Sequence, residues 1–112
     1  MQRRDIAQRS PDVIALMIAS EFSRAASRCA HRDNVLKCYA RAQELFGVME
    51  TLPLSEETAL LFHSLYRQCA SDRLVAEAYL APEIVEKLGT ELAEAFQRVA
   101  EKLQAARMPA PG

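Results

Sequence analysis

The chain has 112 residues, half of them apolar and about a quarter charged, with a formal net charge of −1. This length fits a single domain, 1–112, with a sizeable core, and the composition argues against disorder. A near-neutral charge argues against a dedicated nucleic-acid-binding domain, because such domains usually carry a strong basic excess. With only three glycines and five prolines, most of the chain is expected in a few long helices.

The first helix is predicted from Ser10 to near His31. Ser10 followed by Pro11 is a typical helix start, because serine caps the free amide groups and proline suits the first helical position. Apolar residues then recur at helical spacing, at Ile14, Ile18, Phe22, Ala25 and Cys29. Residues 1–9, which hold three arginines, are expected to form a mobile arm.

The second helix is predicted to begin at a cap formed by Asp33 or Asn34. Its apolar residues step four, three, four and three, at Val35, Tyr39, Ala42, Phe46 and Met49. A seven-residue repeat of this kind suits packing between the helices of an antiparallel bundle. Residues 51–54, which contain Pro53, are expected to break the chain.

The third helix is predicted to start at Ser55, with acidic residues at its positive end. Its apolar face comprises Leu61, Phe62, Leu65, Tyr66, Cys69 and Ala70. Asp72 and Arg73 interrupt this face. Beyond them it is expected to resume, at Leu74, Ala78 and Tyr79.

The fourth helix is predicted to open at Pro82 and to reach about Arg107, leaving 108–112 as a frayed tail. Its apolar stripe is Val85, Leu88, Leu92, Phe96, Val99 and Leu103. Four helices with three short connections favour an all-α, antiparallel up-and-down four-helix bundle.

Residues suited to catalysis or to metal binding do not come together in the sequence. Cys29 and His31 are two positions apart, which directs their side chains to different faces of a helix. The three cysteines form no Cys-x-x-Cys pair, and neither histidine follows a glutamate at the spacing of a di-metal bundle. We therefore expect no enzyme, no metal and no cofactor. We also expect a reducing, cytoplasmic location, because the three cysteines are odd in number and far apart. No membrane span is expected, because no apolar run approaches 18 or so residues.

The apolar stripes are wider than a four-helix bundle requires. The surplus residues are Val13, Leu16, Met17, Leu36, Leu45, Leu60 and Ile84. Two interpretations are open: they fill a deeper core, or they leave exposed grooves or a self-association face. Gly47 and Gly89, both inside predicted helices, indicate either close helix–helix approach or a notch for a partner helix.

Four stretches of the sequence carry a family likeness: residues 10–17, 33–52, 65–78 and 88–96. Taken together, they resemble the bacterial flagellin export chaperones, the FliS family. One departure is Phe96, which stands where tryptophan is frequent in the family.

This resemblance implies a non-catalytic bundle that keeps a helix-forming, C-terminal segment of flagellin soluble before export. The client-binding residues would then be Phe62, Leu65, Tyr66, Leu92 and Phe96, although all five also fit a plain core. The alternative is a structural or regulatory bundle whose apolar faces serve homodimerisation or a different protein client.

Overall fold

The computed structural model describes residues 10–78 and 81–107, and this part contains four α-helices and no strand. The helices are α2 (Pro11–Ser27), α3 (Arg32–Met49), α4 (Glu56–Ala78) and α5 (Pro82–Arg107). The predicted all-α class is therefore confirmed. None of these described helices is both long enough and apolar enough to cross a membrane. The predicted arm (1–9), the predicted tail (108–112) and Tyr79 lie outside the described residues.

Local sequence features mark the starts of three helices. Ser10 and Pro11 take the cap and first positions of α2, as predicted, but the Ser10 side chain makes no capping hydrogen bond. Ser55 precedes α4, and its Oγ accepts a hydrogen bond from the amide of Thr58 at 3.2 Å, which satisfies one of the free donors of the first turn. Pro82 is the first residue of α5, where its missing amide hydrogen is no loss.

The connection between α2 and α3 differs from the prediction. α2 ends at Ser27, because Arg28 leaves the helical conformation with φ −117° and ψ 30°. His31, rather than Asp33, precedes α3, and Asp33 lies in the first turn, where its charge faces the positive end of the helix. Cys29 continues the apolar spacing of α2, but it packs on the core from the connection.

The inward-facing line of α4 runs through Asp72, where an interruption of the apolar face was predicted. Phe62, Leu65 and Cys69 are buried at steps of three and four, and the next step of three reaches Asp72. Asp72 is accordingly 7% exposed, whereas Leu74, expected on the apolar face, is 65% exposed. The helical period therefore decides which α4 side chains face inward, and the residue type does not.

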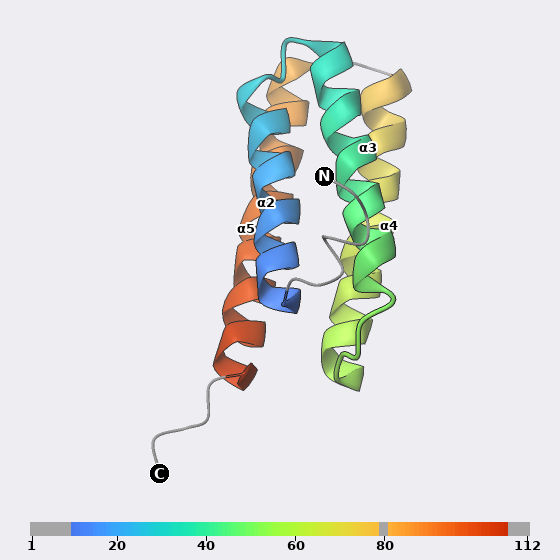
Figure 1. Ribbon diagram of the computed structural model, residues 1–112. Coiled ribbons are helices and arrows are strands. Elements are labelled where there is room, and N and C mark those ends of the chain that lie inside the picture. Colours follow the sequence, from blue (N-terminus) through green and yellow to red (C-terminus); the bar gives the residue numbers. More distant parts are fainter. Residues whose placement is uncertain (1–9, 79–80, 108–112) are drawn as a thin grey trace.

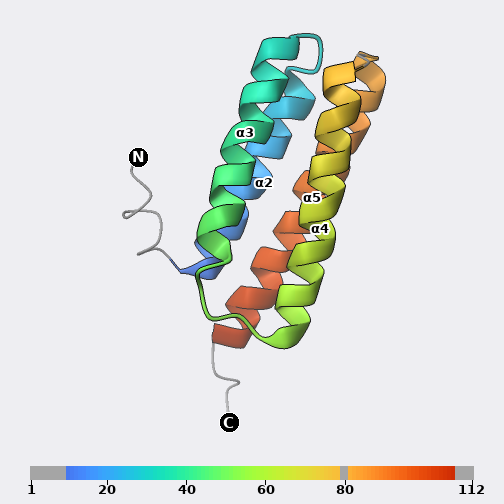
Figure 2. The same cartoon turned by 90° about the vertical axis from the view of Figure 1, so that its right-hand side faces the viewer.

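The four helices lie side by side around one core. Figures 1 and 2 show α2 beside α5 and α3 beside α4, with α2 also next to α3 and α4 next to α5. The backbones of α2 and α5 approach most closely, and α4 makes far fewer close approaches to its two neighbours. α4 is therefore the helix most loosely attached to the others.

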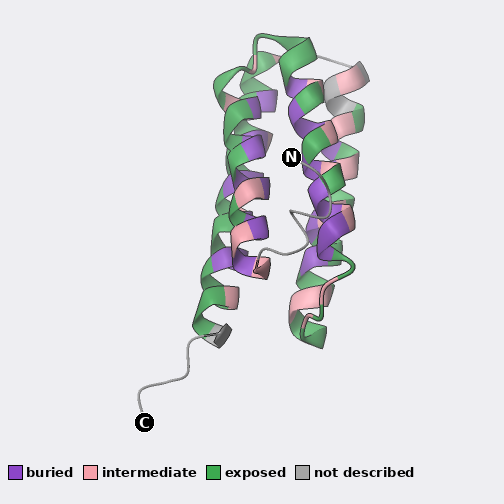
Figure 3. Cartoon of the chain, in the orientation of Figure 1, coloured by how far each residue is buried: buried purple, intermediate pink, exposed green. Residues whose placement is uncertain are grey.

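Phe96 on α5 occupies the centre of the core. It is fully buried, and its ring lies 5.8 Å from Phe22 of α2, 5.2 Å from Phe46 of α3 and 6.2 Å from Phe62 of α4, measured between centroids. One side chain thus contacts the three other helices through aromatic pairs, which prefer such separations. Figure 3 shows the buried faces of the helices turned toward one another.

The surplus apolar residues divide between the two interpretations. Leu45 is buried, and Met17 and Leu36 pack partly buried against the core. Leu16, Leu60 and Ile84 are instead exposed. Part of the surplus therefore deepens the core, and part remains on the surface.

Gly89 permits the close approach of α5 to α2. A Cβ atom at this position would lie 3.0 Å from the carbonyl oxygen of Phe22 and 3.1 Å from the Cβ of Ala26, which confirms the close-packing interpretation.

We expect Gly89→Leu to lower the free energy of unfolding by about 1–3 kcal/mol, because the added atoms have to separate the two backbones. Urea denaturation measures this change, with Thr90→Leu at the neighbouring exposed position as the control. An unchanged midpoint for Gly89→Leu would contradict the expectation.

Candidate functional site

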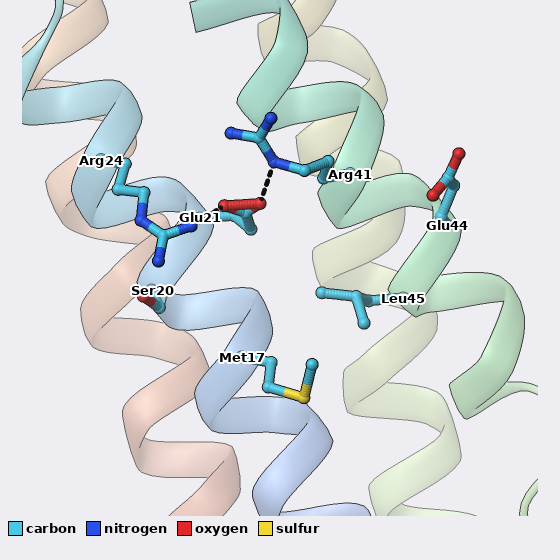
Figure 4. Close-up of a pocket in the computed structure, with 7 residues that line it drawn as sticks. All are labelled: Met17, Ser20, Glu21, Arg24, Arg41, Glu44 and Leu45. Carbon is cyan, nitrogen blue, oxygen red and sulfur yellow. Dashed lines mark hydrogen bonds and ion pairs between the residues drawn. The ribbon is translucent and has the colours of Figure 1, made fainter. Parts of the chain in front are cut away.

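A pocket of about 280 Å³ opens between α2 and α3. Its lining residues are Met17, Ser20, Glu21 and Arg24 from α2, and Arg41, Glu44 and Leu45 from α3. Figure 4 shows Met17 and Leu45 on its apolar side, whereas Glu21 lies between the two arginines. The pocket therefore combines an apolar wall with a charged rim.

Glu21 is a buried carboxylate held by two arginines. Arg24 Nη1 donates to Glu21 Oε1 at 2.8 Å, and Arg41 Nε donates to Glu21 Oε2 at 2.6 Å (Figure 4). A buried carboxylate is tolerated only when it is paired in this way. Each carboxylate oxygen thus accepts a hydrogen bond from an arginine, and the contact with Arg41 ties α3 to α2.

Two of the cysteines are poor nucleophiles. Burial, reinforced by the charge of Glu21, raises the pKa of Cys38, even though Arg41 Nη2 donates a hydrogen bond to its sulfur at 3.4 Å. Burial, reinforced by Asp72, raises the pKa of Cys69 to about 12. Both thiols are therefore protonated at neutral pH, whereas nucleophilic attack needs the thiolate.

A second pocket, of about 390 Å³, lies where the chain passes from α3 into α4. Five of its seven lining residues are apolar, namely Met49, Leu52, Leu54, Ala59 and Phe62, and the others are Glu50 and His63. An apolar pocket with a few polar groups at its edge suits a bulky apolar side chain of a partner.

The structure places the five residues predicted to bind a client in or next to the core. Phe62, Leu65, Leu92 and Phe96 are buried, and Tyr66 is half-buried against them. The ring of Phe46 brings three of them together, since it contacts Phe62, Tyr66 and Phe96 at centroid distances of 4.9–5.2 Å. Their role in client binding stays a prediction.

Phe62 belongs both to this buried set and to the α3–α4 pocket. The other residues of that pocket were not predicted from the sequence. Leu52 and Leu54 flank Pro53, and this segment was predicted only to break the chain. Two leucines in a short connection are the pattern that indicates a connection packed on the core.

The part of the chain that the structure describes holds no group of three or more His, Cys, Asp or Glu side chains placed to bind a metal ion. Comparison with known proteins gives no match: no protein-family model, no curated protein and no solved structure matches this chain.

Proposed function

We propose that this protein is a non-catalytic, protein-binding helical bundle that holds an amphipathic, helix-forming segment of a partner. The observation that carries the proposal is the open, apolar α3–α4 pocket lined by Phe62, Leu52 and Leu54. An amphipathic helix presents apolar anchors at intervals of three and four residues, and such anchors bind in hydrophobic pockets between helices.

The exposed leucines of α4 support the same function. Leu60 and Leu74 are each 65% exposed, and Leu61 is 37% exposed. Large apolar side chains on the surface are common when they are isolated, but α4 carries three of them, and it also contributes Phe62 to the apolar pocket.

We further propose that the helices form an antiparallel up-and-down bundle. Three contacts support this order. Lys102 near the end of α5 pairs with Glu57 at the start of α4 at 2.7 Å. Arg32 at the start of α3 donates to the carbonyl oxygen of Glu77 near the end of α4. Gly89, early in α5, lies against the last turns of α2.

The client, on the resemblance to flagellin export chaperones, is the C-terminal segment of flagellin, and the location is the cytoplasm. The three free cysteines, Cys29, Cys38 and Cys69, fit a reducing compartment. The alternative, a homodimer formed through the exposed leucines, predicts a molar mass of twice 12.5 kDa in light scattering without any client.

The test is calorimetric titration of the full-length protein with a peptide from the C-terminal segment of flagellin. We expect saturable binding, a gain of helix and a negative heat-capacity change, because a disordered segment folds as it buries apolar surface. Leu54→Gln should weaken binding by about tenfold or more, since losing one buried leucine contact removes at least about 1.5 kcal/mol.

Ile84→Gln is the matched control. Ile84 is also an exposed aliphatic residue, at 44% exposure, but it lies at the start of α5, at the other end of the molecule from the pocket (Figure 1). Its substitution should leave the affinity unchanged. Equal binding by the wild-type protein and Leu54→Gln would exclude the pocket as the binding site. No binding at roughly 50 μM peptide, well above the dissociation constants of specific complexes, would exclude flagellin as the client.

A further inference from the structure

Asp72 places a carboxyl group at a core position of α4. It follows Phe62, Leu65 and Cys69 on the inward-facing line of the helix, and it is only 7% exposed. An apolar residue is the usual occupant of such a position. Among the described residues, Oδ2 of Asp72 has no hydrogen-bond partner.

Among the described residues, the titratable groups that interact with the Asp72 carboxyl bring no positive charge to it. Tyr39 faces it from α3, Cys69 from α4 itself and Glu91 from α5. Two of these are neutral at pH 7, and the third is another acid. The ion pairs found between described residues do not include Asp72.

The one cation adjacent in sequence, Arg73, is engaged elsewhere. It donates to Gln43 of α3 and, at 3.0 Å, to Glu77 Oε1 one turn along α4. Burial, with a smaller contribution from Glu91, therefore raises the pKa of Asp72 to about 6. The carboxyl is mostly neutral at pH 5 and mostly ionised at pH 7.

An ionised carboxylate in this position opposes the packing of α4. Its burial without a partner is unfavourable, and the helix can relieve it by moving away from α3 and α5. α4 is the helix with the fewest close approaches to its neighbours, so its separation from the bundle should cost the least free energy. Phe62 and Leu65 would leave the core with it, and Phe46 and Phe96 would be uncovered.

We propose that Asp72 is a proton-controlled switch for α4: the neutral carboxyl keeps the helix packed, and the ionised carboxylate favours an opened form. The biological meaning rests on the proposed function: a client first contacts the α3–α4 pocket, and opening of α4 then uncovers Phe62 and Phe96, two of the residues predicted to bind it. The switch accounts for their burial in the closed molecule. Client capture is then favoured near neutral pH and disfavoured near pH 5.

Amide hydrogen exchange on the full-length protein tests the switch without any client. Exchange rates at about pH 5 and about pH 7 are divided by the intrinsic rates of an unstructured chain at the same pH. If the pKa of Asp72 falls from about 6 to an ordinary 3.8 on opening, the protection of α4 should drop roughly tenfold between these pH values. Protection of α2 and α5 should change less.

Asp72→Asn is the decisive variant, because asparagine keeps the shape of the neutral acid and cannot ionise. Its α4 protection should change less than about twofold between the two pH values. Asp33→Asn, at an exposed aspartate in the first turn of α3, is the control and should behave as the wild type. A tenfold change that persists in Asp72→Asn, or that is equal in all four helices, would overturn the proposal.

Peptide titration separates this proposal from the proposed function. Protection that depends on Asp72, in a protein that binds no flagellin peptide, would support the switch and reject that client. Peptide binding of equal affinity at both pH values, in the wild type and in Asp72→Asn, would support the function and overturn the switch.

Discussion

Replacing Phe96 with alanine should lower the free energy of unfolding by about 3–5 kcal/mol. Phe96 is fully buried, and its ring contacts Phe22, Phe46 and Phe62, one from each of the other helices. Alanine removes the transfer free energy of a large side chain and leaves a cavity that four helices have to close together. A loss of this size is a large part of the stability of an ordinary small domain. Urea denaturation followed by circular dichroism measures it.

Phe96→Leu provides the volume control, because leucine refills most of the cavity while losing the three aromatic pairs. It should cost less than half of the alanine substitution. Leu74→Ala, at a residue that is 65% exposed, should change stability by less than about 0.5 kcal/mol. A cost below about 1 kcal/mol for Phe96→Ala would show that the four helices do not share one core at this residue.

The helices of this chain were predictable because their starts and faces depend on local chemistry. Ser10 with Pro11, Ser55 and Pro82 each mark a helix start through the chemistry of one or two residues. The inward faces follow from the helical period alone. Neither inference requires knowledge of what the helix packs against.

Two features were missed because they depend on tertiary structure. The polar character of Asp72 was taken as a break in the stripe, although the period placed it inward. The end of α2 was predicted near His31, but the helix ends at Ser27, and residues 28–31 form the connection in which the chain reverses. At Asp72 the helical spacing was correct, and the interpretation of the residue was wrong. At the end of α2, Cys29 keeps the helical spacing and packs on the core, but it lies beyond the helix.

The candidate site was predictable only in part. Phe62 was identified from its helical face, but the leucines that form a pocket with it lie in a connection. Where a connection folds back onto the core depends on the packing of both helices that it joins. Leu52 and Leu54 therefore carry no periodic pattern from which a pocket can be inferred.

The second large effect is expected in the pH dependence of stability. The pKa of Asp72 is raised from an ordinary 3.8 to about 6 in the folded protein, chiefly by burial. A raised pKa means that the folded state binds the proton more tightly than the unfolded state does. The stabilisation is therefore complete below pH 3.8 and is lost as the pH rises through 6. A pKa difference of about 2 corresponds to about 3 kcal/mol.

Asp72→Asn should consequently have nearly the same stability as the wild type at about pH 4 and be more stable by about 2–3 kcal/mol at about pH 7. Urea denaturation of both proteins across this pH range measures the difference in stability. The contributions of the other titrating groups cancel in this difference, because both proteins share those groups. Asp33→Asn should show no comparable gain, since Asp33 is exposed. The opposite result is a stability difference between Asp72→Asn and the wild type that stays constant with pH. It would mean that the carboxyl of Asp72 has the same pKa in the folded and the unfolded chain, and the proposed control of α4 by protonation would be wrong.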